Sequence, residues 1–142
     1  TVREGDAAIV EQFVDLYKKT LNDANTALAD SIWQPGPKTS MVHPRGEDIG
    51  WENIRQHFYI DRLQKLYTER HFEFHDLDIE VYRDTAIAMY TWDFHGKLRS
   101  DGTEIEHKGR TSQTYRRTSQ EGWKILHAHI SGMPIANERQ PI

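Results

Sequence analysis

The chain has 142 residues, 37% hydrophobic and 28% charged, which is typical of one globular domain over residues 1–142 and excludes a disordered chain. Cysteine is absent and the formal net charge is −4, which excludes disulfides, Cys-ligated zinc, a thiolate nucleophile and a basic nucleic-acid surface. No apolar run approaches the ~20 residues that span a bilayer, so we expect a soluble, cytoplasmic protein with no nucleic-acid or membrane partner.

The N-terminal part of the chain has helical periodicity. Apolar side chains recur at helical spacing from Ile9 to Leu21 and predict an amphipathic helix with Asp6 as its N-cap. Residues 22–25 break this helix and supply capping side chains. A shorter helix is expected roughly from Thr26 to Trp33, and the Gln-Pro-Gly-Pro segment at residues 34–37 stops it.

A short strand and a third helix are expected next. Residues Thr39 to His43 lead into Pro44 and are typical of a short strand, and residues 47–50 are typical of a turn and cap. Apolar residues at helical spacing then predict the longest helix, from about Trp51 to Tyr67.

After Thr68 the apolar residues alternate with a period of about 2. This pattern predicts strands near residues 72–81, 86–96, 104–117 and 123–131, with a β-bulge near residues 75–76 where the phase shifts. Three helices followed by a four-stranded antiparallel meander indicate the α+β class. A strongly bent sheet around a helix leaves a cone with an open mouth, and such concave sites bind small molecules.

The last predicted strand carries the most distinctive residues. His127, His129 and Ser131 alternate with Leu126, Ala128 and Ile130, so the strand has one polar face and one apolar face. The strand opens at a tryptophan and closes with Gly-Met-Pro.

The order of elements resembles the nuclear transport factor 2-like superfamily over nearly the whole chain. Four segments are similar to its SnoaL-like branch: His-Pro-Arg-Gly at 43–46, Gly-Trp-Glu-Asn-Ile-Arg at 50–55, Gly-Arg-Thr-Ser at 109–112, and the strand at 123–131. That strand is also similar to the association (hub) domain of calcium/calmodulin-dependent protein kinase II. The superfamily includes isomerases, cyclases, dehydratases, hubs and transport factors, so the resemblance leaves the activity open.

The resemblance implies roles for several residues. His43 stands where the ketosteroid isomerase branch has a general base before a proline. Tyr17 stands where that branch has a tyrosine that donates a hydrogen bond to an oxyanion, and Thr111 replaces its second donor, a carboxylic acid. The arginines of the kinase hub pocket are replaced by Thr91, Gln113 and Ile130.

His43 and Tyr17 are therefore the catalytic candidates. Histidine titrates near ~6.5 and serves as base or acid at neutral pH. The alternative for His43 is a half-buried histidine bonded to a backbone carbonyl beside Pro44. The candidate ligand-binding residues are Trp33, Trp51, Tyr59, Asp93 and Gln113. Most of the helix aromatics are expected in the core, with one or two at the cone mouth.

The implied strand parity also assigns faces. It turns the alternating apolar residues of the last strand toward the pocket, and it turns Arg110, His127, His129 and Ser131 to the outer side of the sheet. These four residues form either a polar cluster that fixes register or a subunit interface, or a ligand site. A histidine pair without a third ligand is a weak metal site, and we expect no metal and no cofactor.

On the strand at residues 86–96, Asp93 is expected on the pocket side with Ile87 and Met89. Burial there would raise the pKa of its carboxyl group, whereas a place at the open strand end would leave it in water. The large aromatics of this strand would then face outward, so that both faces are apolar. We therefore expect a homodimer or larger homo-oligomer formed through the outer face.

Two functions remain open from the sequence. The first is a small-molecule isomerase, cyclase or dehydratase with His43 as general acid–base and Tyr17 as oxyanion donor. The second is a non-catalytic ligand-binding or oligomerisation domain. In both cases the partner is a small apolar or mixed-polarity organic ligand.

Overall fold

The computed structural model describes residues 4–134. The helices are α1 (Asp6–Asp23), α2 (Thr26–Ile32) and α3 (Trp51–Asn53), which continues as the π-helix η1 (Ile54–Gln64). The strands are β1 (Ser40–His43), β2 (Gly46–Ile49), β3 (Tyr67–Tyr82), β4 (Thr85–Leu98), β5 (Glu104–Thr118) and β6 (Gly122–Gly132). The predicted α+β class is confirmed, and so is the element order apart from the added strand β2. Helix α1, with 18 residues, is longer than the third helix.

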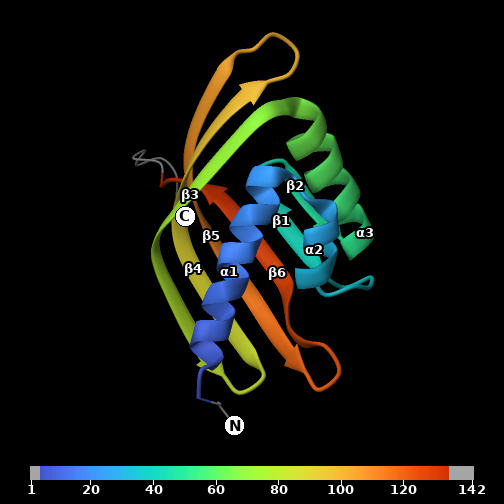
Figure 1. Ribbon diagram of the computed structural model, residues 1–142, viewed down its shortest axis with the longest axis vertical. Helices are drawn as coiled ribbons and strands as arrows, with labels where there is room; N and C mark the ends of the chain where they lie inside the picture. The colour runs from blue at the N-terminus through green and yellow to red at the C-terminus, as the bar shows by residue number, and fades with distance from the viewer. Residues whose placement is uncertain (1–3, 135–142) are drawn as a thin grey trace, which may run out of the picture.

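The six strands form one sheet in the order β2-β1-β6-β5-β4-β3. Strands β3 to β6 form the predicted antiparallel meander, while β1 pairs parallel to β6 and antiparallel to β2. All the helices lie on one face of this curved sheet, with α1 across β3 and β4 and the third helix beside β1 and β2 (Figure 1). No helix within residues 4–134 is long and apolar enough to cross a membrane.

Strand β2 was not expected, because residues 47–50 have the composition of a turn. The chain instead reverses at Pro44 and Arg45, and the next four residues pair with β1 in a hairpin, with His43 opposite Gly46. Gly46 has a φ of 136°, a backbone conformation that favours glycine. This hairpin becomes important below because it brings Asp48 beside His43.

Helix α1 is fastened to the sheet at both ends. Gly5, not Asp6, is its N-cap, and Asp6 instead accepts two hydrogen bonds from Arg117 Nη1 on β5, at 3.0 and 2.9 Å. Near the other end, Asn22 Oδ1 accepts the Phe72 backbone N–H at 2.6 Å, and Asn22 Nδ2 donates to the Phe72 carbonyl at 3.3 Å. Asn25 caps α2 by accepting from the Leu28 N–H at 3.0 Å.

The faces of β4 are opposite to those predicted. Ala86, Ala88 and Tyr90 are buried under the helices, whereas Ile87 and Met89 are 41% and 55% exposed on the outer face. Both alternating sets are apolar, so hydrophobicity could not choose between them. The register with β5 decides the matter, because it sets Ala88 opposite the buried Gln113.

Two bulges set the remaining faces. The predicted β-bulge in β3 is confirmed, as the register shifts between His75 and Asp78 and Asp76 has a φ of 56°. A second shift in β6 leaves Leu126 out of the ladder to β5. Beyond it, Ala128 is buried on the helix side and His129 is exposed on the other, so the polar face of β6 lies outward as predicted.

Candidate functional site

A cavity of about 470 Å³ lies between α1, η1 and the helix-covered face of the sheet. Its wall is mainly apolar, formed by Tyr17, Leu21, Phe58, Leu63, Tyr67, Phe72, Phe74, Trp92, Phe94 and Ile130. Its polar lining residues are His43, Arg45, Arg62, His107, Lys108 and Thr111. Arg45, His107 and Lys108 are exposed and mark the side that opens to solvent. This size and lining suit a small organic molecule with an apolar body.

Aromatic rings from β3 and β4 form one continuous wall of the cavity. The ring centroid of Phe72 lies 4.6 Å from that of Phe94 and 5.7 Å from that of Trp92, and Tyr67 is 5.1 Å from Phe94. Offset and edge-on aromatic contacts of this kind are favourable. Trp92 and Phe94 of β4 therefore line the cavity, although Ile87, Met89 and Asp93 were expected on this side.

Gly109 on β5 makes room for this wall. It lies opposite Trp92 in the strand register, and a Cβ atom at this position would collide with the Trp92 ring and with the Ser131 carbonyl. Only glycine lets the indole ring lie flat across the neighbouring strand. This gives a physical reason for the glycine in the Gly-Arg-Thr-Ser segment.

His43 lies at the end of β1 and lines the cavity with Pro44. Its Nε2 is 2.9 Å from Asp48 Oδ2 on β2, and its side chain and that of Asp48 are only 15% and 11% exposed. Asp48 Oδ1 in turn is 2.7 Å from His57 Nδ1 on η1. The carboxylate of Asp48 therefore joins two histidines, of which His43 faces the cavity and His57 is exposed.

The two contacts of the His43 ring, to Asp48 and to the Arg45 backbone, fit one tautomer. An ionised carboxylate only accepts hydrogen bonds, so His43 Nε2 carries the hydrogen and Nδ1 holds a lone pair. The Arg45 backbone N–H donates to that Nδ1 at a long 3.3 Å. The predicted alternative, a bond to a backbone carbonyl beside Pro44, is not what the structure has.

Tyr17 lies on α1 and lines the same cavity. Burial, with smaller effects from Tyr59 and Tyr115, raises the pKa of its hydroxyl well above the usual range, so the phenol stays protonated. The Tyr17 hydroxyl has no hydrogen-bond partner within residues 4–134. The Tyr17 oxygen itself is almost fully shielded, so its O–H is an unsatisfied buried donor beside the cavity and not part of the exposed cavity surface.

Three of the predicted ligand-binding aromatics lie in the core instead. Trp33, Trp51 and Tyr59 are 0%, 5% and 0% exposed, and none lines the cavity. Trp33 Nε1 donates to Tyr59 Oη at 3.1 Å, and Trp51 Nε1 donates to Asp30 Oδ1 at 2.8 Å. Their polar atoms form hydrogen bonds inside the protein and do not face the cavity.

The other two predicted ligand-binding residues also lie elsewhere. Gln113 is buried on the helix side, where its Oε1 accepts from Tyr115 Oη at 3.1 Å, and it is not part of the cavity lining. Asp93 is on the outer face, because the parity of β4 is reversed. There it pairs with His75 Nε2 at 2.9 Å and with Lys108 Nζ at 3.7 Å.

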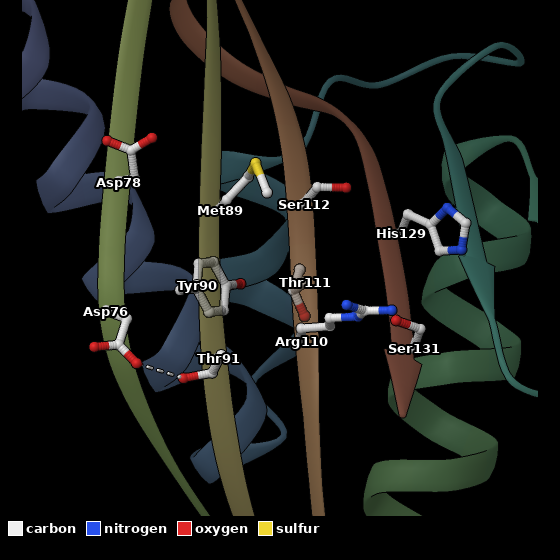
Figure 2. Close-up of a pocket in the computed structure, with 10 residues that line it drawn as sticks. All are labelled: Asp76, Asp78, Met89, Tyr90, Thr91, Arg110, Thr111, Ser112, His129 and Ser131. Carbon is white, nitrogen blue, oxygen red and sulfur yellow. Dashed lines mark hydrogen bonds between the residues drawn. The ribbon is translucent and has the colours of Figure 1, made fainter. Parts of the chain in front are cut away.

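Only three of the four polar residues predicted on the outer face lie close together. Arg110, His129 and Ser131 line a shallow hollow with Asp76, Asp78, Met89, Thr91 and Ser112, whose side chains point away from the helices (Figure 2). His127 lies apart, with its Nδ1 2.7 Å from Ser40 Oγ on β1. Burial, helped by nearby His129, lowers the pKa of His127, although a hydrogen bond with the Ser40 backbone acts in the opposite direction.

Sequence reasoning missed Asp48, His57, Arg45 and Arg62. Asp48 lies opposite Met41 in the hairpin and therefore on the same face as His43, but the segment lacks the alternation of a strand, so the hairpin was not expected. The described residues contain no group of three or more metal-ligating side chains placed to hold an ion.

Comparisons with known proteins give the chain a family and a fold. The model of the SnoaL-like domain family matches residues 10–136. A nuclear transport factor 2 (NTF2-like) superfamily protein from Salmonella enterica is 27% identical, with 96% of each chain covered and a TM-score of 0.92. Among curated proteins, none matches in sequence.

Two further solved structures share the fold at low identity. A ketosteroid isomerase-like protein from Erwinia carotovora atroseptica is 12% identical, with 94% of this chain and 100% of that chain covered and a TM-score of 0.78. The CaMKII hub from S. rosetta is 19% identical, with 93% and 100% covered and a TM-score of 0.75. The predicted superfamily, its SnoaL-like branch and the likeness to the kinase hub are confirmed.

Proposed function

We propose that this chain, which belongs to the SnoaL-like domain family, is a small-molecule enzyme in which His43 acts as general acid–base. The observation that carries the proposal is the His43–Asp48 pair at the edge of an aromatic-walled cavity that opens on one side. Many isomerisations, cyclisations and dehydrations begin when a base removes a proton from carbon. Such a step needs a base held in place beside an apolar substrate.

The geometry supports a division of roles. Asp48 holds the Nε2–H of His43, which directs the lone pair of Nδ1 to the substrate proton and stabilises the imidazolium that forms. The substrate displaces the long contact between Nδ1 and the Arg45 amide. Tyr17 donates its free O–H to the developing oxyanion, and the aromatic wall keeps water out of the site.

Solvent exchange tests the base directly, before any full substrate is identified. Cyclic and aryl ketones with an acidic C–H are incubated with the protein in deuterium oxide, and uptake of deuterium is measured by mass spectrometry. We expect His43→Gln to slow the uptake by about 10²–10⁴-fold, because glutamine keeps the hydrogen bond to Asp48 but cannot take a proton.

His71→Gln is the matched control, since His71 is exposed and pairs with Glu73 outside the cavity. Uptake that is equal in wild type and His43→Gln would exclude His43 as the base. If the wild type exchanges none of the ketones, the catalytic role fails and the alternative below remains.

The alternative is a non-catalytic ligand-binding domain that assembles through the outer sheet face. The observation in its favour is the exposure of Ile87 and Met89 on the outer face, where Met89 lines a hollow of about 470 Å³ (Figure 2). An apolar patch next to polar groups is typical of a surface that a second copy covers. We expect a homodimer or larger homo-oligomer, which Met89→Asp would dissociate.

Light scattering measures this assembly. A mass of 16.7 kDa for the wild type at micromolar concentration would contradict it. Thr103→Asp, at the exposed start of the β5 hairpin and away from the hollow, is the control that should leave the mass unchanged.

A further inference from the structure

The charged side chains that line the cavity are all cationic, although Asp48 is bonded to His43 at its edge. Its lining includes Arg45 and Arg62, together with Lys108, whose Nζ is turned to Asp93 on the outer face, and no aspartate or glutamate of residues 4–134 lines it. The whole chain nevertheless carries a net charge of −4. The positive charge at this opening is therefore local, and it opposes the charge of the rest of the molecule.

Two of these cations have no counter-charge. Lys108 pairs with Asp93 at 3.7 Å, and Arg55, on the same helix as Arg62, pairs with Asp30 at 3.4 Å. The guanidinium groups of Arg45 and Arg62 form no ion pair with any carboxylate of the described residues, and neither donates a side-chain hydrogen bond there. Each therefore has up to five N–H donors for a ligand.

The partial burial of Arg62 raises the free-energy cost of leaving its guanidinium group without an anionic partner. Its guanidinium is partly buried, and the pKa of Arg62 is lowered first by that burial and then by the nearby Arg45. Two like charges held together at a partly desolvated site destabilise each other unless an anion lies between them. A carboxylate matches the planar, forked geometry of guanidinium donors.

The cavity thus has two chemically distinct parts. One wall is made of Phe72, Trp92 and Phe94, and it offers ring faces to a flat apolar molecule. The other part holds the two unpaired arginines beside His43. A ligand that fills both parts has an aromatic body and one acidic group.

We propose that the substrate or ligand of this cavity is an aromatic carboxylate, with its rings against the β3–β4 aromatic wall and its carboxylate bound by Arg45 and Arg62. This inference rests on the proposed function only in taking this cavity as the substrate site. It gives the arginines a binding and positioning role and leaves the proton transfer to His43.

The test uses two probes of the same shape, 2-naphthoate and its neutral amide, 2-naphthamide. Binding is measured by calorimetry and by quenching of tryptophan fluorescence. We expect the wild type to bind 2-naphthoate about tenfold more tightly than 2-naphthamide, and we expect salt to weaken this preference. Arg62→Gln and Arg45→Gln should each reduce the preference, while Arg55→Gln should keep it.

Arg62→Lys separates charge from geometry, since lysine keeps the charge but loses the fork, and it should retain part of the preference. Thermal unfolding of each variant shows that it is folded. Should Arg62→Gln not fold, Arg45→Gln still decides the question, because Arg45 is exposed and its loss creates no internal gap.

Equal affinity for the two probes, an unchanged preference in both arginine variants, or no binding of 2-naphthoate would each overturn the proposal. Its failure is distinct from failure of the proposed function. A lost preference with His43-dependent deuterium uptake intact overturns only the anion site, and a retained preference without any uptake overturns only the catalysis.

Discussion

The two faces of the sheet differ although they are built from the same strands and from neighbouring residues. On the helix side, Tyr90 is 3% exposed, and its ring stacks on Phe74 with centroids 4.2 Å apart. One residue away, Met89 is 55% exposed on the outer face. The helix side thus holds the packing and the cavity, while the outer side carries the histidines and charges that meet water.

The effect of a substitution therefore depends on the face of the sheet that the residue occupies, more than on its position along the strand. On the helix side, changes act through volume, because the space is closed by α1 and η1. On the outer side, changes act through charge and hydration. Three measurements would break or sharpen this contrast.

The largest effect is expected from Tyr90→Ala compared with its neighbour Thr91→Ala. Removal of the buried Tyr90 ring should lower the free energy of unfolding by about 3–5 kcal/mol. Thr91→Ala, on the outer face, should change it by no more than about 0.5 kcal/mol. Urea denaturation measures both, and similar losses for the two variants would break the contrast between the faces.

A medium effect is expected from Gly109→Ala compared with Gly132→Ala, its partner in the register of β5 and β6. An added Cβ at Gly109 meets the Trp92 ring and the Ser131 carbonyl, while one at Gly132 meets no atom within 4 Å. Gly109→Ala should cost about 1–3 kcal/mol and should weaken 2-naphthoate binding through the displaced Trp92 ring.

Gly132→Ala should change the free energy of unfolding by little and so controls for the added methyl group, but its binding is not compared because Gly132 lines the cavity. Urea denaturation measures the stability of both variants, and calorimetry measures binding by Gly109→Ala. If Gly109→Ala loses stability but binds 2-naphthoate as well as the wild type, Trp92 is not part of the binding wall.

The smallest effect is a pH dependence at His127 on the outer face. Burial, more than His129, lowers its pKa in the folded protein below its usual value of about 6.5. Between these two pKa values the unfolded chain binds more protons, so the free energy of unfolding falls as the pH falls through that window. Because His127 is mostly solvated, we expect a loss of at most about 0.5 kcal/mol.

His127→Gln should remove this slope between about pH 7.5 and about pH 5, whereas His95→Gln should keep it, since His95 is exposed. Urea denaturation at several pH values measures the slopes. A slope that is identical in His127→Gln and the wild type would place the pH dependence elsewhere.

The parts of the fold that follow from local patterns were predicted from the sequence. The helix from Ile9 to Leu21 and the bulge at residues 75–76 depend on spacing within one segment, so periodicity was enough. His43 and Tyr17, suggested by resemblance, do lie on the lining of one cavity. Their catalytic roles remain a proposal.

The parts that depend on long-range pairing could not be predicted. Strand β4 has apolar residues on both faces, and only its register with β5 turned Trp92 inward and Asp93 outward. Asp48 became the partner of His43 through a hairpin that has no hydrophobic alternation. Arg45 lies in the turn between β1 and β2, and Arg62 lies on η1, so no local sequence pattern connects them. Only the fold places both on the cavity.

The two attachments of α1 decide how a ligand can enter. Asp6 is held by Arg117 at one end, and Asn22 is bonded to the Phe72 backbone near the other, so the helix that carries Tyr17 cannot swing outward without breaking both. The opposite side of the cavity is formed by the Pro44–Arg45 turn and by η1, where Arg45 is exposed and unpaired. The cavity therefore opens on the hairpin side, and the arginine that we propose to bind the incoming acid lies at that opening.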